Sequence, residues 1–327
     1  MKTSIANGVV VAGDGRTLLE NVSVMLQDET IADIPKIRYT PYDPADRMID
    51  AEGGYIIPGV INNHTHGITP GPFLPFGLPK LSERRCIDNL NRHLLQGETT
   101  ICSVDGLSTI WECETMNKIH PTNIRTCTLH TPLNVKSAEL QDGRGIQEKH
   151  RNLSAEKMVE LGAVAIGEVG SPGTPYGALV IGGRAGRDIS FEDAKKFKGA
   201  LFSTPDGFDL APADEGRVRE MLKEIGLAER ITVDSARRIA EDLVLYFKTA
   251  MEGIDEAVIL GMKLGVPVIC HHSPDNTGWV LAAAEKAGSY LVASHSNISF
   301  EPKEAVDRAK KLKEHGAVID IFTSDPF

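Results

Sequence analysis

The sequence predicts an α/β protein: a (β/α)8-type TIM barrel that follows a small N-terminal β-sandwich domain. From Tyr55 onward, apolar strands alternate with amphipathic helices in one repeated order, and such alternation calls for a parallel sheet. Residues of types that bind metals follow four of these strands, and the carboxyl ends of barrel strands converge on one site. An open sheet would place its site at a single switch point, so a closed barrel fits better.

The first 55 residues predict the small β-sandwich domain. Short β-type runs at 8–12 and 22–26 are separated by turn-forming residues at 13–15 and followed by another run at 31–34. Brief strands separated by turns are typical of such a sandwich. We therefore assign residues 1–55 to this domain and residues 56–327 to the barrel.

The barrel segment predicts seven strand-and-helix steps. The first helix begins near Ser82, places apolar residues at helical spacing, and ends at Gly97. A shorter helix runs from Ser154 to Gly162. The strands after the first are expected at residues 99–104, 123–133, 163–168, 266–271, 290–295 and 317–322.

Two irregularities qualify this barrel. About one hundred residues separate Glu168 from His271, which predicts an insertion at about 171–250 on the active-site side. After the seventh strand the sequence ends, so the eighth strand and the return strands of the sandwich are not visible. We expect either that the chain is longer or that another chain completes the barrel.

Composition restricts the partners. The net charge of -10 argues against a nucleic-acid groove and against an anionic membrane surface, so a small-molecule substrate is expected. We also expect a homo-oligomer. No signal peptide or membrane span is evident. Five cysteines without a Cys-x-x-Cys pair fit a reduced, cytoplasmic protein, in which we interpret them as packing residues.

The most informative motif is His64-Thr-His66-Gly67, at the end of the first apolar strand. Alternate strand residues share a face, so both imidazoles point the same way, as zinc, iron or nickel would require. Glu168, His271 and His295 end three other strands, and we predict that all five residues bind metal. A hydrogen-bonded histidine pair is the alternative for His64 and His66. His272 is the alternative to His271, because neighbouring strand residues face opposite sides.

Other candidate residues are less specific. His130, after the third strand, is a candidate substrate contact at the barrel mouth. Asp325 follows an apolar strand and is a candidate catalytic carboxylate, although a loop aspartate before proline is the simpler interpretation. The remaining histidines in helical or polar contexts are expected to be solvated: His93, His120, His150 and His315.

These motifs together resemble the amidohydrolase superfamily over nearly the whole chain. The resemblance rests on Pro58-Gly59 before the histidine pair, on Gly97-x-Thr99-Thr100, and on Glu168, His271 and His295. The segment Ile166-Gly-Glu168-Val-Gly170 is most similar to enamidases and related cyclic-amide hydrolases. The resemblance implies two divalent metal ions, zinc with iron or manganese as alternatives. His64 and His66 would bind the more buried ion, His271 and His295 the other, and Glu168 would bridge them.

The chain departs from the family pattern in two places. Asn62 stands where an aspartate is common, and the aspartate of the eighth strand, which ordinarily serves as ligand and general base, is not in the sequence. The predicted function is metal-dependent hydrolysis of a C–N bond in a small cyclic amide or imide by a metal-activated hydroxide. The alternatives are a heterocycle deaminase of the same superfamily and a noncatalytic subunit.

Overall fold

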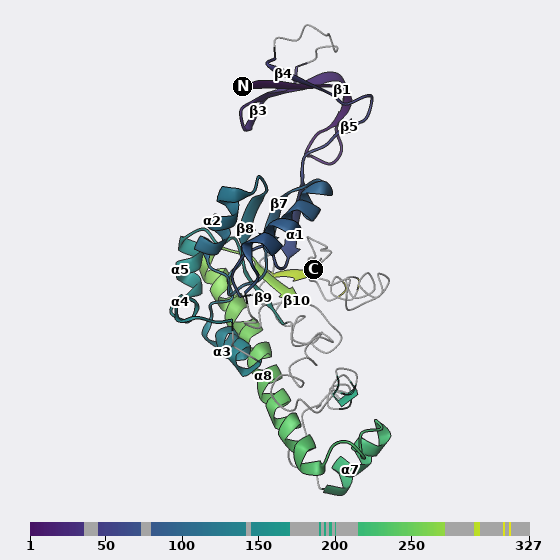
Figure 1. The fold of residues 1–327 in the computed structure, drawn as a ribbon, viewed down its shortest axis with the longest axis vertical. Helices are drawn as coiled ribbons and strands as arrows, with labels where there is room; N and C mark the ends of the chain where they lie inside the picture. The colour runs from purple at the N-terminus through teal and green to yellow at the C-terminus, as the bar shows by residue number, and fades with distance from the viewer. Residues whose placement is uncertain are drawn as a thin grey trace. The chain divides into compact units, whose positions relative to one another are not determined.

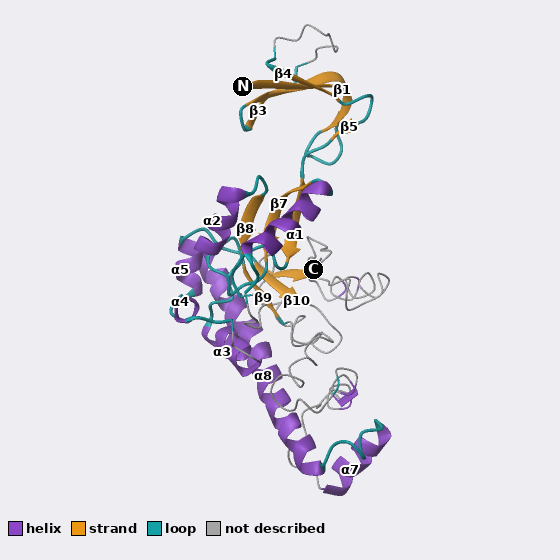
Figure 2. Ribbon diagram, in the orientation of Figure 1, coloured by secondary structure: helices purple, strands orange, loops and turns teal. Residues whose placement is uncertain are grey.

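The computed structural model describes residues 1–35, 45–72, 80–141, 145–170, 215–271 and 291–294, with single residues at 190, 193, 196, 197, 200, 310 and 314. The chain divides into two compact units, Met1–Val60 and Ile61–Phe327, which we describe separately. Figure 1 labels their elements, and Figure 2 shows that strands make up the first unit while helices and strands make up the second.

The first unit is a single five-stranded sheet. Its strands are β1 (Lys2–Val11), β2 (Leu18–Gln27), β3 (Thr30–Asp33), β4 (Arg47–Asp50) and β5 (Tyr55–Ile56). The order is β3-β2-β1-β4, and β5 pairs with β1. Val10, Val22 and Val24 form the buried centre of one face. The β-rich N-terminal unit is therefore present, but the described residues form one sheet rather than a two-sheet sandwich.

The second unit contains six described strands in two sheets. One sheet has the order β6-β7-β8, with β6 (Val60–Thr65), β7 (Glu98–Ser103) and β8 (Asn123–Thr126). The other has the order β11-β10-β9, with β9 (Ile166–Val169), β10 (Val268–His271) and β11 (Leu291–Ser294). A parallel bridge between Thr128 and Ile166 connects the two sheets.

This arrangement confirms a mixed α/β fold with parallel strand pairs. The barrel is not closed within the described part of the chain. The predicted seventh strand at 317–322 lies outside the described residues, so the closed (β/α)8 barrel stays a prediction.

Helices follow the strands and cover the second unit. They are α1 (Glu83–Leu95), α2 (Ile110–Ile119), α3 (Pro132–Gln141), α4 (Glu148–Arg151), α5 (Ala155–Glu160), α7 (Glu215–Glu224) and α8 (Val233–Leu264). The predicted first helix is confirmed: the Ser82 side chain accepts a hydrogen bond from the Arg85 amide, and Gly97 follows the helix with a φ of 83°. No helix among the described residues is both long and apolar enough to cross a membrane.

The expected strand at 123–133 is too long. The structure ends β8 at Thr126 and begins α3 at Pro132. Proline lacks an amide N–H and its fixed φ suits the first position of a helix, so Pro132 favours a helix start over a strand end.

Two of the apolar clusters in the second unit pack helices against strands. One packs α1 and α2 against β7 through Leu90, Ile101 and Met116. The other packs α8 on β9 and β10 through Ile166, Met251 and Val268. All five cysteines are buried and free, consistent with packing residues.

Candidate metal centre

The two histidines of the sequence motif lie at the end of strand β6, His64 within the strand and His66 directly after its last residue, Thr65. The imidazoles of His64 and His66 both face Glu168, and only 0% and 3% of the two residues' surfaces are exposed. The backbone amide of His64 donates a hydrogen bond to Asn62 Oδ1 at 3.0 Å, and Asn62 Nδ2 donates to Glu98 Oε2 at 3.0 Å. Asn62 thus stabilises the end of the strand although the resemblance leads one to expect an aspartate there.

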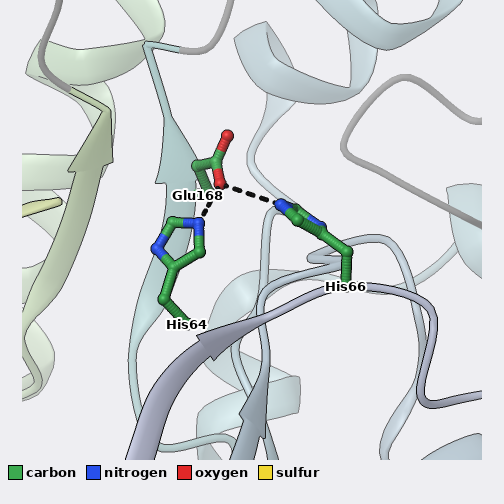
Figure 3. A group of neighbouring side chains, drawn as sticks. All are labelled: His64, His66 and Glu168. Carbon is green, nitrogen blue, oxygen red and sulfur yellow. Dashed lines mark ion pairs between the residues drawn. The ribbon is translucent and has the colours of Figure 1, made fainter. Parts of the chain in front are cut away.

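Strand β9 brings Glu168 to both imidazoles. Its Oε2 atom lies 2.7 Å from His64 Nε2 and 3.3 Å from His66 Nε2 (Figure 3). One ligand atom from each of these three residues lies within 4.8 Å of the others, and all three residues are buried. Two imidazole nitrogens and a carboxylate oxygen that converge in this way form a donor set suited to a divalent transition metal.

Strand β10 adds His271 beside this group. His271 Nε2 lies 3.7 Å from Glu168 Oε1, and its ring centre lies 6.0 Å from that of His64. The structure therefore brings together four of the five predicted ligands. His295 lies outside the described residues, as do Asp325 and His272, so their predicted roles stay predictions.

The sequence interpretation missed Asp105, which orients His66. Asp105 is 1% exposed, its Oδ1 lies 2.8 Å from His66 Nδ1, and its Oδ2 accepts a hydrogen bond from the Gly67 amide at 2.6 Å. A carboxylate at Nδ1 keeps a proton there and leaves Nε2, the atom that faces Glu168, available for a metal. Asp105 follows the predicted strand at 99–104, so the rule that found Glu168 would also have found it.

Electrostatics favour charged groups in this buried cluster. Burial alone would raise the pKa of Glu168, but the imidazoles of His271 and His64 outweigh burial and hold the pKa well below its usual range. Burial would lower the pKa of His66, but hydrogen bonds to Asp105 and Glu168 raise it well above its usual value. A buried anion surrounded by imidazoles needs positive charge, which either protons or a metal ion would supply.

His130 is buried near the end of β8. It is 2% exposed, its Nδ1 lies 3.0 Å from Thr128 Oγ1, and its Nε2 has no hydrogen-bond partner among the described residues. Burial lowers its pKa to about 4, so the ring is neutral at pH 7. Its predicted contact with a substrate stays a prediction.

The expectation that His93, His120 and His150 are solvated is wrong. They are 6%, 7% and 2% exposed, because each finds a polar partner in the fold. His93 Nδ1 lies 2.6 Å from Glu98 Oε2, His120 Nε2 lies 3.3 Å from Asn91 Oδ1, and His150 Nε2 lies 3.2 Å from Glu112 Oε1. His315 lies outside the described residues.

Comparisons with curated proteins give short matches. An imidazolonepropionase from Salinispora arenicola is 41% identical over 61 residues, which are 18% of this chain and 15% of that protein. A 5-methylthioadenosine/S-adenosylhomocysteine deaminase from Pyrococcus furiosus is 41% identical over 63 residues, which are 19% of this chain and 14% of that protein. These matches agree with the resemblance of this chain to the amidohydrolase superfamily. They show no specific similarity to enamidases.

The similar solved structures share little sequence identity with this chain. No family model matches the chain. The crystal structure of an amidohydrolase shares 15% sequence identity with this chain and aligns with a TM-score of 0.45. The alignment covers 99% of this chain and 78% of the amidohydrolase chain. A prolidase in complex with N-methylphosphonate-L-proline is 14% identical over the same shares, with a TM-score of 0.44.

Proposed function

We propose that the chain is a metal-dependent hydrolase of the amidohydrolase superfamily that cleaves a C–N bond in a small cyclic amide or imide. The observation that supports this most strongly is the buried group of His64, His66 and Glu168, with His271 beside it. A scaffold protein has no physical need to bury these polar side chains together, because burial of polar groups costs free energy unless they are paired.

The arrangement of Glu168 supports a site for two ions. Its Oε2 atom faces His64 and His66, while its Oε1 atom faces His271 of β10. Glu168 could therefore help to hold an ion on either side of its carboxylate. We propose that His64 and His66 hold one ion, that His271 and His295 hold the other, and that both ions are zinc.

Each residue of the proposed site would have a separate role in the hydrolysis. A divalent ion held here would lower the pKa of a water molecule and polarise the carbonyl of the substrate. Asp105 would keep His66 in the tautomer that offers Nε2. His130, neutral at pH 7, would donate a hydrogen bond from Nε2 to a substrate oxygen while Nδ1 accepts one from Thr128 Oγ1. Asp325 is the candidate in this chain to take a proton from water and pass it to the leaving nitrogen.

A substrate panel tests this proposal. Protein reconstituted with zinc is incubated with lactams, imides and hydantoins, and ring opening is followed by the appearance of a carboxylate product. We expect turnover of at least one ring class, abolished in His64→Ala. No turnover on any ring by a zinc-loaded protein would contradict the proposed substrate class.

Deamination is a second candidate, favoured by the matches to deaminases. The products distinguish deamination from amide hydrolysis, because a deaminase releases ammonia while the ring of its substrate stays closed. Ammonia release from aminated purines without ring opening of the amides would favour this alternative.

A further inference from the structure

A contact between two glycines joins the loop after β7 to strand β9. A methyl group on Gly106 would lie 2.6 Å from the Leu129 Cβ atom and closer still to the carbonyl oxygen of Gly167, whereas real Cβ atoms essentially never approach within 3.0 Å. The obstacle at Gly167 is backbone, which cannot rotate away as a side chain can. We call this contact the glycine seam, formed by Gly106 and Gly167.

Both sides of the glycine seam are fixed by other contacts. Gly106 accepts a hydrogen bond through its carbonyl oxygen from the Leu129 amide at 2.6 Å, and the Gly167 amide donates to Thr128 O at 2.9 Å. Gly167 has a φ of 145°, which side chains rarely adopt, and a methyl group there would lie 2.6 Å from Ile269 O. Neither glycine can therefore move aside without the loss of backbone contacts.

The two glycines of the seam are sequence neighbours of the two carboxylates that contact His66. Asp105 directly precedes Gly106, and Glu168 directly follows Gly167. These two carboxylates contact opposite nitrogens of His66, Asp105 at Nδ1 and Glu168 at Nε2. The separation of the two backbone segments thus determines whether one imidazole can reach both carboxylates at once.

We infer that Gly106 and Gly167 are positioning residues, whose close contact sets the spacing between Asp105 and Glu168 and prepares His66 for metal. This inference rests on the proposed metal site. A methyl group on Gly106 would push its backbone away from Gly167, and a methyl group on Gly167 would push β9 away from Ile269 of β10 and so displace Glu168. Either shift would be about several tenths of an ångström or more, while metal sites tolerate only about 0.2 Å in ligand distances. Substitution should therefore weaken metal binding while the fold persists.

The test measures metal binding rather than activity. Cobalt and zinc are titrated into wild type, Gly106→Ala and Gly167→Ala, with cobalt absorption read directly and zinc affinity measured against a chelator. Gly13→Ala is the matched control, because a methyl group at this exposed glycine meets nothing within 4 Å. Circular dichroism and the Tm of metal-free protein report folding.

We expect a loss of zinc affinity of about 10- to 100-fold in both seam variants, with an altered cobalt spectrum and native circular dichroism, and no change in Gly13→Ala. Wild-type affinity and spectrum in folded seam variants would overturn the inference and leave the proposed function intact. Failure of both seam variants to fold would also overturn it, because the seam would then be a general packing requirement. If wild type itself binds neither ion, the proposed function fails, and the inference fails with it.

Discussion

Replacement of Asp105 by asparagine tests how the fold prepares His66 for metal. Both carboxylate oxygens of Asp105 are in use, Oδ1 with His66 Nδ1 at 2.8 Å and Oδ2 with the Gly67 amide at 2.6 Å. An asparagine offers only one oxygen. If that oxygen stays on Gly67, the amide N–H₂ faces His66 Nδ1 and moves the imidazole proton to Nε2, the atom proposed to bind metal.

The opposite orientation of the asparagine is no better. If its oxygen faces His66, its N–H₂ group opposes the Gly67 N–H, and a buried donor is left unsatisfied at a cost of about 1–3 kcal/mol. Since about 1.4 kcal/mol corresponds to a tenfold change in an equilibrium constant, we expect Asp105→Asn to weaken zinc binding by about 10- to 100-fold.

Competition with a chromophoric chelator at neutral pH measures this change, and unfolding curves recorded in excess chelator show whether the metal-free fold persists. Asp88→Asn serves as the control, because Asp88 is an exposed residue of α1 in the same unit. If Asp105→Asn binds zinc as tightly as Asp88→Asn and wild type do, the proposed role of Asp105 in metal binding is wrong.

Two further predictions concern buried polar groups other than the proposed metal ligands. Glu112→Gln should lower the free energy of unfolding, measured in urea, by about 1–3 kcal/mol, because the Glu112 carboxylate accepts hydrogen bonds from Lys149 Nζ at 2.6 Å and from His150. The control is Glu114→Gln, because Glu114 is exposed. Equal stability of the two variants would refute the prediction. Because folding lowers the pKa of His130 from 6.5 to about 4, the unfolded chain takes up the proton first. The stability present above pH 6.5 should therefore fall by roughly 3 kcal/mol as the pH approaches 4. His130→Gln should lose less over this range, and parallel pH profiles of the two proteins would contradict this.

The candidate metal cluster could be predicted from sequence because its signals are local. A strand period of two residues places His64 and His66 on one face, and the end of an apolar run identifies Glu168 and His271 as candidates. The structure places these four side chains together. Asp105 also ends an apolar run, but a search limited to metal ligands does not ask which group orients a ligand.

Other features depend on contacts that sequence patterns do not reveal. His150 looked solvated because its neighbours are polar, yet it pairs with Glu112, 38 residues away in the chain. The third strand was predicted to extend to Leu133, whereas β8 ends at Thr126 and Pro132 begins α3. The need for glycine at position 106 comes from Gly167 across the fold and has no local signature.

Metal content is the measurement that tests the central claim most directly. Wild type and His66→Ala are purified without chelator, exposed to zinc and dialysed. Their metal content is then measured by inductively coupled plasma mass spectrometry. We predict up to two zinc ions per wild-type chain, with the loss of at least one in His66→Ala. Wild-type protein that retains its fold but binds no transition metal would contradict the account.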